Sequence, residues 1–334
     1  MMRSRLQAYG ALARIELAGF SFVAVMGGFA AAGALPALDV LCLFVANAIL
    51  VIFGFVHNDI MDEAVDRLAG DEVERPLVQG LVSRREAWIL AAVCLVGNPA
   101  FLFAVFRSRS AAAVLFLAQV LAGVYNGCSK KFPGADIFYA ASAALLCLSG
   151  ALAVVERGAP LPPLVWIVMA VMFAEHLFFN VVAGGMKDLT LDRRAGVRTL
   201  VLALGREEGN RVQVSRVFQC GALALKAVSV GLVFVPFVLL ELPGGTVQVF
   251  MLAVLATGTF FYTGRLLGHD PADRKGILDL TRKEETLCKA LVPVMLISVV
   301  GVPWALLVVV FPVLWFLVLN FLLHGALLTN PQSF

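Results

Sequence analysis

Long apolar runs alternate with short polar segments along the whole chain, and this alternation is the strongest pattern in the sequence. Nine of the runs reach about the 20 residues that an α-helix needs to cross a bilayer. They cover residues 10–34, 38–57, 86–106, 110–126, 137–155, 162–184, 212–240, 244–267 and 288–327. The last run could hold two helices, because Gly301, Pro303 and Pro312 are positions where it could bend or divide. The pattern therefore predicts nine spans and leaves ten open.

Composition leads to the same fold class. Of the 334 residues, 60% are hydrophobic and only 15% are charged, which is more apolar side chain than a soluble domain of this length could bury. We predict an all-α, polytopic membrane bundle that forms a single domain over residues 1–334. The six cysteines are scattered and form no CxxC pair, which argues against a disulfide framework or a zinc site. A net charge of +3 is too small to indicate a nucleic acid partner.

The basic residues are distributed unevenly among the loops, and this distribution predicts an orientation. Of the 26 Lys and Arg residues, 22 lie on one side of the predicted membrane. The other four fall in the loops of the opposite side or inside a span; they are Arg107, Arg109, Arg157 and Lys226. Those 22 lie in the amino terminus, in the loops, or at the helix ends that flank them; the loops are 58–85, 127–136, 185–211 and 268–287. Cytoplasmic loops collect positive charge. We therefore expect a multi-pass protein of the cell membrane whose amino terminus and long polar loops face the cytoplasm.

An acidic segment, Asn58-Asp59-Ile60-Met61-Asp62-Glu63-Ala64-Val65-Asp66, directly follows the second apolar run. If that helix continues, Asn58, Asp62 and Asp66 recur at i, i+4 and i+8 and share one face. A carbonyl and two carboxylates on one face are oxygen ligands that suit Mg²⁺. Asp59 and Glu63 fall off this face, so we expect them to matter less.

A second acidic pair follows the sixth run. Asp188 and Asp192 are again four residues apart, and each lies 126 residues after its counterpart in the first segment. This displacement predicts an internal repeat in which spans 1–4 correspond to spans 5–8. Two acidic pairs with Lys and Arg between them suit a polyanion held through Mg²⁺, since that ion combines a few carboxylates with phosphate oxygens.

These segments resemble two signatures of the UbiA-type intramembrane prenyltransferase superfamily. The first segment matches the pattern NDxxDxxxD, and the second matches DxxxD. The residues after the first motif, Arg75-Pro76-Leu77-Val78-Gln79-Gly80-Leu81-Val82-Ser83, are similar to the family's RPLxxGxxS stretch. The residues after the second, from Asp192-Arg193 through Thr199 to Gly205, are similar to its continuation. With the number of spans, the resemblance extends over nearly the whole chain.

The resemblance implies a bundle of nine helices around a central cavity, with both motifs at its cytoplasmic mouth under cap loops. It implies that Asn58 and the four aspartates Asp62, Asp66, Asp188 and Asp192 bind Mg²⁺ and the diphosphate of an isoprenyl donor, with the aspartates essential for catalysis. Ionisation of the donor then passes the prenyl group to an aromatic or lipid-like acceptor and releases diphosphate.

Several polar residues near the motifs are candidates for contacts with the diphosphate. Family members commonly carry YxxxK after the fourth span, whereas this chain has Tyr125-Asn126-Gly127-Cys128-Ser129-Lys130-Lys131, with the lysine one place late. We assign the family role to Lys130 and treat Lys131 as a topological charge. The remaining candidates are Lys187, Arg75, Arg193 and Asn180, the last because it precedes Asp188 by eight residues and would lie on nearly the same helical face.

Polar residues inside the apolar runs are costly in hydrocarbon and therefore informative. Glu175 and Lys226 occupy the middle of consecutive spans, and a structural ion pair is the favoured interpretation. Glu16 or His176 could hold or deprotonate an acceptor, although a core histidine is the simpler interpretation of His176.

The sequence leaves the acceptor and the donor chain length open. It also leaves two other functions open: a membrane terpene cyclase that uses the same ionisation, and an ion-coupled transporter built on an internal repeat.

Overall fold

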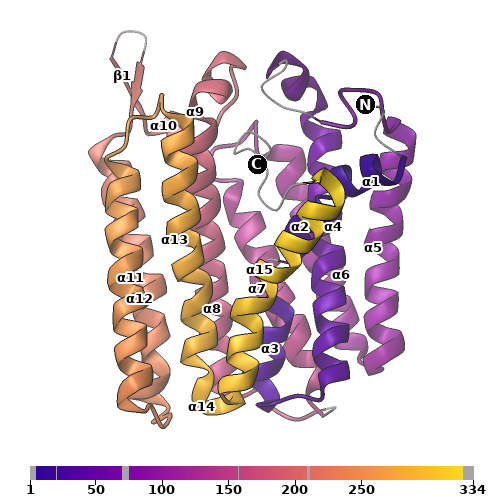
Figure 1. The fold of residues 1–334 in the computed structure, drawn as a ribbon, viewed down its shortest axis with the longest axis vertical. Helices are drawn as coiled ribbons and strands as arrows, with labels where there is room; N and C mark the ends of the chain where they lie inside the picture. Colours follow the sequence, from indigo (N-terminus) through magenta and orange to yellow (C-terminus); the bar gives the residue numbers. More distant parts are fainter. Residues whose placement is uncertain (1–4, 20, 70–74, 157, 209–210, 326–334) are drawn as a thin grey trace.

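The computed structural model describes residues 5–19, 21–69, 75–156, 158–208 and 211–325. Within these ranges the chain is almost wholly helical, and its long helices run side by side along the height of the molecule (Figure 1). The elements are α1 (Arg5–Ala13), α2 (Ile15–Ala18), α3 (Val23–Ala32), α4 (Ala37–Ala69), α5 (Arg84–Phe106), α6 (Arg109–Cys128), α7 (Asp136–Val154), α8 (Pro163–Phe178), the π-helix η2 (Phe179–Gly184), α9 (Gly185–Arg194), α10 (Leu200–Ala203), β1 (Arg206–Glu208), β2 (Arg211–Gln213), α11 (Arg216–Leu239), α12 (Thr246–Leu267), α13 (Arg274–Met295), α14 (Ile297–Val300) and α15 (Val302–His324). The strands β1 and β2 form a small antiparallel hairpin.

The described part of the chain contains nine helical stretches that are long and apolar enough to cross a membrane, as the sequence predicts. The ninth differs from the predicted run at 288–327, which divides at Gly301, where φ is +83°. Helix α15 is the apolar stretch after this break, and α13 begins inside the predicted loop 268–287. At 22 residues, α13 is about 33 Å long, which is the length of a membrane span, although its charges keep it out of the nine apolar stretches. The division that left ten spans open is therefore present, and the loop prediction for 274–287 is wrong.

The first predicted span is not one helix. Arg14, with φ at +43°, ends the helical path between α1 and α2, because L-residues adopt this left-handed conformation only locally. The apolar crossing is built from α2 and α3, while α1 lies at the end of the bundle (Figure 1). Arg14, the charged residue at this break, contacts the first acidic segment.

Close packing of α3 against α7 depends on two glycines. A Cβ added at Gly27 would lie 1.9 Å from the carbonyl oxygen of Cys147, and one added at Gly150 would lie 1.9 Å from that of Ala24. The two backbones are thus in direct contact, as is typical where small residues face each other between membrane helices. Asn47 of α4 strengthens the junction, because its Oδ1 accepts a hydrogen bond from the Ala24 N–H at 3.2 Å.

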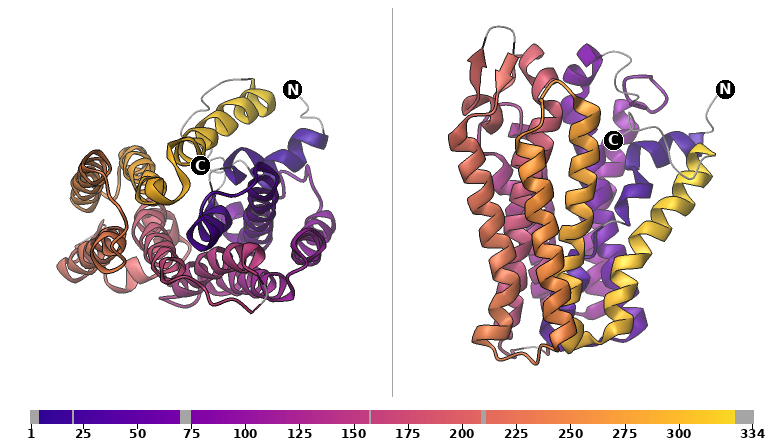
Figure 2. Two further views of the ribbon diagram at one scale, coloured as in Figure 1. Left: turned by 90° about the horizontal axis from the view of Figure 1, so that it is seen from below. Right: turned by 60° about the vertical axis from the view of Figure 1, so that its left-hand side comes forward.

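Seen from below, the long helices follow one another around the bundle in chain order, and α15 lies on the outside between the first helices and α13 (Figure 2). Trp315 of α15 donates a hydrogen bond through Nε1 to the Ile15 carbonyl at 2.8 Å. Helices α1, α9 and α10 and strand β1 lie at the same end of the molecule (Figure 1). The segments that the sequence assigns to one membrane side therefore meet at one end.

Candidate functional site

The first acidic motif is helical throughout, because α4 continues without a break to Ala69. Residues 55–69 contain no glycine or proline that would stop it. The condition for Asn58, Asp62 and Asp66 to share a face is therefore met. Asp59 lies off that face and is only 1% exposed.

The second motif lies on α9, where Asp188 and Asp192 stand one turn apart as predicted. Helix α9 follows the six-residue π-helix η2, whose wider turn breaks the 3.6-residue period assumed for Asn180. The predicted position of Asn180 on nearly the same face as Asp188 stays a prediction. Asn180 donates a hydrogen bond to Asp136 of α7 at 3.3 Å.

Lys130, in the turn after α6, connects the two motifs. Its Nζ lies 2.7 Å from Asp192 Oδ1. Burial by itself would lower the pKa of Lys130, but the carboxylates of Asp192, Asp62 and Asp188 outweigh burial and the pKa is raised. The ammonium is therefore held charged among aspartates from both motifs.

The neighbouring lysine is placed differently. Lys131 is exposed, and its Nζ donates to the Gly127 carbonyl in the last turn of the preceding helix α6 at 3.0 Å. The Lys130 carbonyl also accepts the Arg198 N–H at 3.0 Å, so the loop after α9 fixes the position of this turn. The geometry agrees with the assignment of the family's lysine to Lys130, despite its shift by one position.

Two arginines hold the first motif from the outside. Arg75 lies 3.5 Å from Asp66 and 3.8 Å from Asp59, measured between Nε and the carboxylate oxygens. Arg14, at the break between α1 and α2, lies 2.7 Å from Asp59 and over the ring of Phe55. Arg75 is among the residues predicted from the sequence, whereas Arg14 is not. A charged residue inside an apolar run was the signal that could have found Arg14.

Two further cations lie near the second motif. Lys187 Nζ is 3.6 Å from Asp188 Oδ2, and Arg274, the first residue of α13, is 3.7 Å from Asp188 Oδ1. Arg193 occupies the last turn of α9, next to Asp192. Lys187 and Arg193 were predicted, whereas Arg274 was not, because it lies in a segment that the sequence assigned to a loop.

The two halves of this site differ in charge. Asp59, Asp62 and Asp66 outnumber Arg14 and Arg75, leaving one negative charge in excess on the first half. The side chains of Asn58 and Asp62 make no hydrogen bond or ion pair with any residue that the structure describes.

On the second half, three cations outnumber two carboxylates; the cations are Lys130, Lys187 and Arg274. Among the described residues, the motif carboxylates do not come close enough together to form an all-protein metal cage. The donor set fits an ion such as Mg²⁺ that is shared between a few carboxylates and phosphate oxygens.

A separate charged cluster lies deep between α8, α11 and α13. The Lys226 ammonium is 2.8 Å from Glu175, as predicted, and 2.7 Å from Glu284 of α13, which the sequence analysis missed. Cys288 Sγ lies 3.2 Å from the same ammonium. Among the described residues, one group of side chains is compact enough to hold a metal ion, and it consists of Glu175, Glu284 and Cys288. Because Lys226 already sits among them, the arrangement is that of a buried ion pair that joins three helices.

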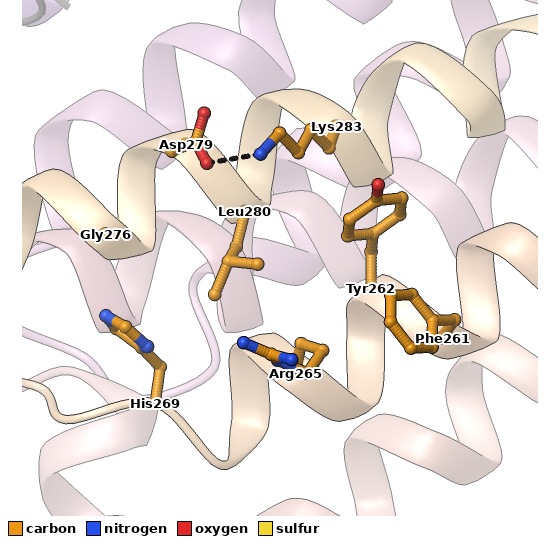
Figure 3. A pocket seen from close by; sticks show the side chains of 8 residues that line it. All are labelled: Phe261, Tyr262, Arg265, His269, Gly276, Asp279, Leu280 and Lys283. Atoms are coloured by element: carbon orange, nitrogen blue, oxygen red, sulfur yellow. Dashed lines mark hydrogen bonds and ion pairs between the residues drawn. The ribbon is translucent and has the colours of Figure 1, made fainter.

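A small pocket of about 270 Å³ lies between α12 and α13 (Figure 3). Tyr262 and Arg265 of α12 face Asp279 and Lys283 of α13, and the last two are paired at 2.6 Å. No motif aspartate lines this pocket. We therefore do not assign it to the acidic site.

Comparison with known proteins identifies relatives over most of the chain. The sequence profile of the UbiA prenyltransferase family matches residues 20–277. A digeranylgeranylglyceryl phosphate synthase of Halobacterium salinarum is 33% identical over 52% of this chain and 59% of its own length. A 4-hydroxybenzoate octaprenyltransferase of Nitrosospira multiformis is 31% identical over 54% of this chain and 60% of its own length. The chain thus aligns with about three fifths of the length of these relatives.

Solved structures agree in fold. A structure of digeranylgeranylglyceryl phosphate synthase superposes with a TM-score of 0.64 at 18% identity, covering 89% of this chain and 99% of that one. A UbiA homologue of Archaeoglobus fulgidus, bound to DMAPP and Mg²⁺, superposes with a TM-score of 0.59 at 20% identity, covering 85% and 98%. The predicted all-α membrane bundle is confirmed.

Proposed function

Because the chain belongs to the UbiA prenyltransferase family, we propose that it transfers the prenyl group of an isoprenyl diphosphate to an aromatic or lipid-like acceptor and releases diphosphate. The observation that carries this proposal is the position of Lys130. It links the turn after α6 to Asp192 of α9 at 2.7 Å, and Asp62 and Asp188 are near enough to raise its pKa. At Lys130 the first motif, which has excess negative charge, comes close to the second motif, which has excess positive charge. A metal–diphosphate complex needs both, because the metal binds carboxylates and the phosphate oxygens bind cations.

The site residues fall into two groups, one that would bind the metal and one that would bind the diphosphate. Asn58, Asp62, Asp66, Asp188 and Asp192 would hold Mg²⁺, which when bound neutralises charge on the departing diphosphate. Lys130, Lys187, Arg75 and Arg193 supply the remaining positive charge to the diphosphate oxygens as the allylic C–O bond breaks and its electron pair leaves with the diphosphate. Asn180 is held by Asp136, so we propose that it orients the wall of the site and does not bind phosphate.

Two names among the relatives suggest which acceptors to try first. One relative is named for a glycerophosphate lipid and the other for 4-hydroxybenzoate. The two classes share a nucleophilic oxygen or ring carbon that can capture an allylic cation and then lose a proton. We propose an acceptor from one of these classes.

We also propose that the amino terminus and the acidic mouth face the cytoplasm. The loops that carry most of the basic residues lie at the end of the bundle where α1 and α9 lie, and cytoplasmic loops collect positive charge. A cysteine-accessibility experiment on intact cells, with single cysteines at Gln79 and at Pro160, tests the orientation. Labelling by an impermeant reagent at 160 and not at 79 is expected.

The function is tested with purified protein in nanodiscs. Isoprenyl diphosphates of five to twenty carbons are presented with geranylgeranylglyceryl phosphate or 4-hydroxybenzoate, with Mg²⁺ or with EDTA, and products are identified by mass spectrometry. A prenylated acceptor that forms with Mg²⁺ and not with EDTA is the expected result. A cyclic hydrocarbon or alcohol formed from the donor without acceptor would indicate a terpene cyclase.

Binding gives an independent readout. Mg²⁺ with an isoprenyl thiodiphosphate should raise the thermal stability of the wild type, since a ligand that binds only the folded state stabilises it. The gain should vanish in Asp62→Ala and in Asp188→Ala. If no chain length of thiodiphosphate stabilises the wild type, the proposed donor is wrong.

A further inference from the structure

A second pocket opens on the side of the bundle between α4, α5 and α6, and its volume is about 430 Å³. Its walls are almost entirely apolar and include the aromatic rings of Phe53 and Trp88. Small residues at Ala91 and Gly123 leave the space open. It contains none of the motif aspartates, so it is distinct from the acidic site.

Two polar groups in this pocket have unused hydrogen-bonding capacity. Gln119 is fully buried, and its Nε2 donates to the Cys94 carbonyl at 3.0 Å, while its Oε1 has no partner in the described structure. A buried amide oxygen without a partner costs about 1–3 kcal/mol, which a ligand with a hydrogen-bond donor would relieve. Gln119 thus offers one acceptor.

His57 offers one donor. Asn126 Nδ2 donates to the Gly54 carbonyl at 2.9 Å and approaches His57 Nδ1 at 3.3 Å. Because the amide nitrogen is the donor, Nδ1 accepts, and the imidazole proton lies on Nε2. The His57 ring is stacked on Phe53 and lies edge-on to Trp88, which fixes its orientation. Among the described residues, Nε2 has no hydrogen-bond partner.

The depth of the pocket limits what can occupy it. Trp88 lies four residues into α5, about 6 Å along the helix from its first residue. Met61, at the other edge, directly precedes Asp62. Trp88 and Met61 are 41% and 38% exposed, so the pocket opens sideways where the hydrocarbon meets the polar end of the bundle. A ligand would therefore enter this pocket from the side of the bundle.

We propose that this pocket binds a neutral apolar molecule that carries one hydroxyl group, such as a lipid alcohol or a phenol. The hydroxyl donates to Gln119 Oε1 and accepts from His57 Nε2–H, and the apolar body lies against Phe53 and Trp88. The pocket has no charged wall residue that would favour a phosphate or carboxylate head. This site does not depend on the proposed prenyl transfer.

The test uses a hexadecanol that carries a photoactivatable diazirine, with its O-methyl ether as the matched probe. The ether can accept from His57 but cannot donate to Gln119. In nanodiscs of the wild type, the alcohol should label peptides that contain residues 53–61 or 119–124 about three- to tenfold more than the ether, which is the range of one net hydrogen bond. Equal labelling by the two probes would mean a crevice for acyl chains only and would overturn the proposal.

Two variants test separately the hydrogen bond to Gln119 and the free volume of the pocket. Gln119→Leu should remove the preference for the alcohol, and Gly123→Val should abolish labelling by both probes, because its Cβ would lie 3.6 Å from Phe53 Cζ and 3.9 Å from His57 Cε1. Gly97→Val on α5 is the control, since nothing lies within 4 Å of a Cβ there. Wild-type labelling in Gly123→Val would also overturn the proposal. If Gln119→Leu does not fold, the ratio of the two probes in the wild type decides alone.

Discussion

The two acidic motifs have the same four-residue spacing but are built differently. On α4, Arg14 and Arg75 engage Asp59 and Asp66, while Asp62 has no ion pair within the described residues. On α9, both aspartates are paired with cations. Equal spacing therefore does not give the two aspartate pairs equal electrostatic surroundings. The first motif presents a carboxylate suited to a metal, and the second presents cations suited to a phosphate.

The largest effect is expected where the first motif is unpaired. Asp62→Ala should reduce turnover by about a thousandfold or more, because several kcal/mol of metal-dependent stabilisation of the transition state is lost. Diphosphate release at saturating Mg²⁺ measures it. Glu63→Ala is the matched control, since Glu63 is paired with Arg67 and Arg84 off the shared face and should retain most activity. Equal losses in the two variants would refute the argument from the helical face.

The second motif should respond chiefly in donor affinity. Lys130→Met should lower kcat/KM for the donor about tenfold to hundredfold, since a charge-assisted hydrogen bond to phosphate is lost. Lys131→Met, one residue on, should be close to wild type because its ammonium is exposed and hydrogen-bonded to the Gly127 carbonyl of α6. If Lys131→Met lowered kcat/KM as much as Lys130→Met, the assignment of the family's lysine role to Lys130 would be wrong.

The buried pair behind the first motif should affect stability more than binding. Arg14→Met leaves the Asp59 carboxylate, 1% exposed, without its closest partner, and should cost about 3 kcal/mol of folding stability. Thermal unfolding in detergent measures the loss. The double variant Arg14→Met with Asp59→Asn should recover much of it, because no uncompensated charge remains. A double variant as unstable as the single one would show that Arg14 acts through packing on Phe55.

The smallest effect is expected at the edge of the second motif. Arg274→Gln should raise the KM for the donor about threefold, because a partly exposed ion pair contributes little. The effect should shrink at high salt, where exposed charges are screened. If Arg274→Gln weakened use of the donor as much as Lys130→Met, Arg274 would have to contact the diphosphate as directly as Lys130 does.

The membrane bundle and the two aspartate pairs could be predicted from the sequence, whereas the continuity of α4 was a condition of that prediction that the structure meets. Apolar runs of membrane-spanning length and the i, i+4 spacing depend only on helical geometry and on the cost of exposing apolar side chains to water. The Glu175–Lys226 pair was also predictable, because two opposite charges in hydrocarbon need each other.

Which charges meet depends on how separate helices pack against one another. Arg14 and Arg274 are far in sequence from the aspartates they contact, and no local pattern indicates such pairings. The π-helix η2, which contains Asn180, was not predictable either, because it arises within a continuous apolar run, and only helix packing brings Asn180 to Asp136. Lys130 was already preferred to Lys131 from the sequence, but its contact with Asp192 depends on how the turn after α6 packs against α9. Periodicity determines faces within one helix, whereas the packing of separate helices determines which faces come together.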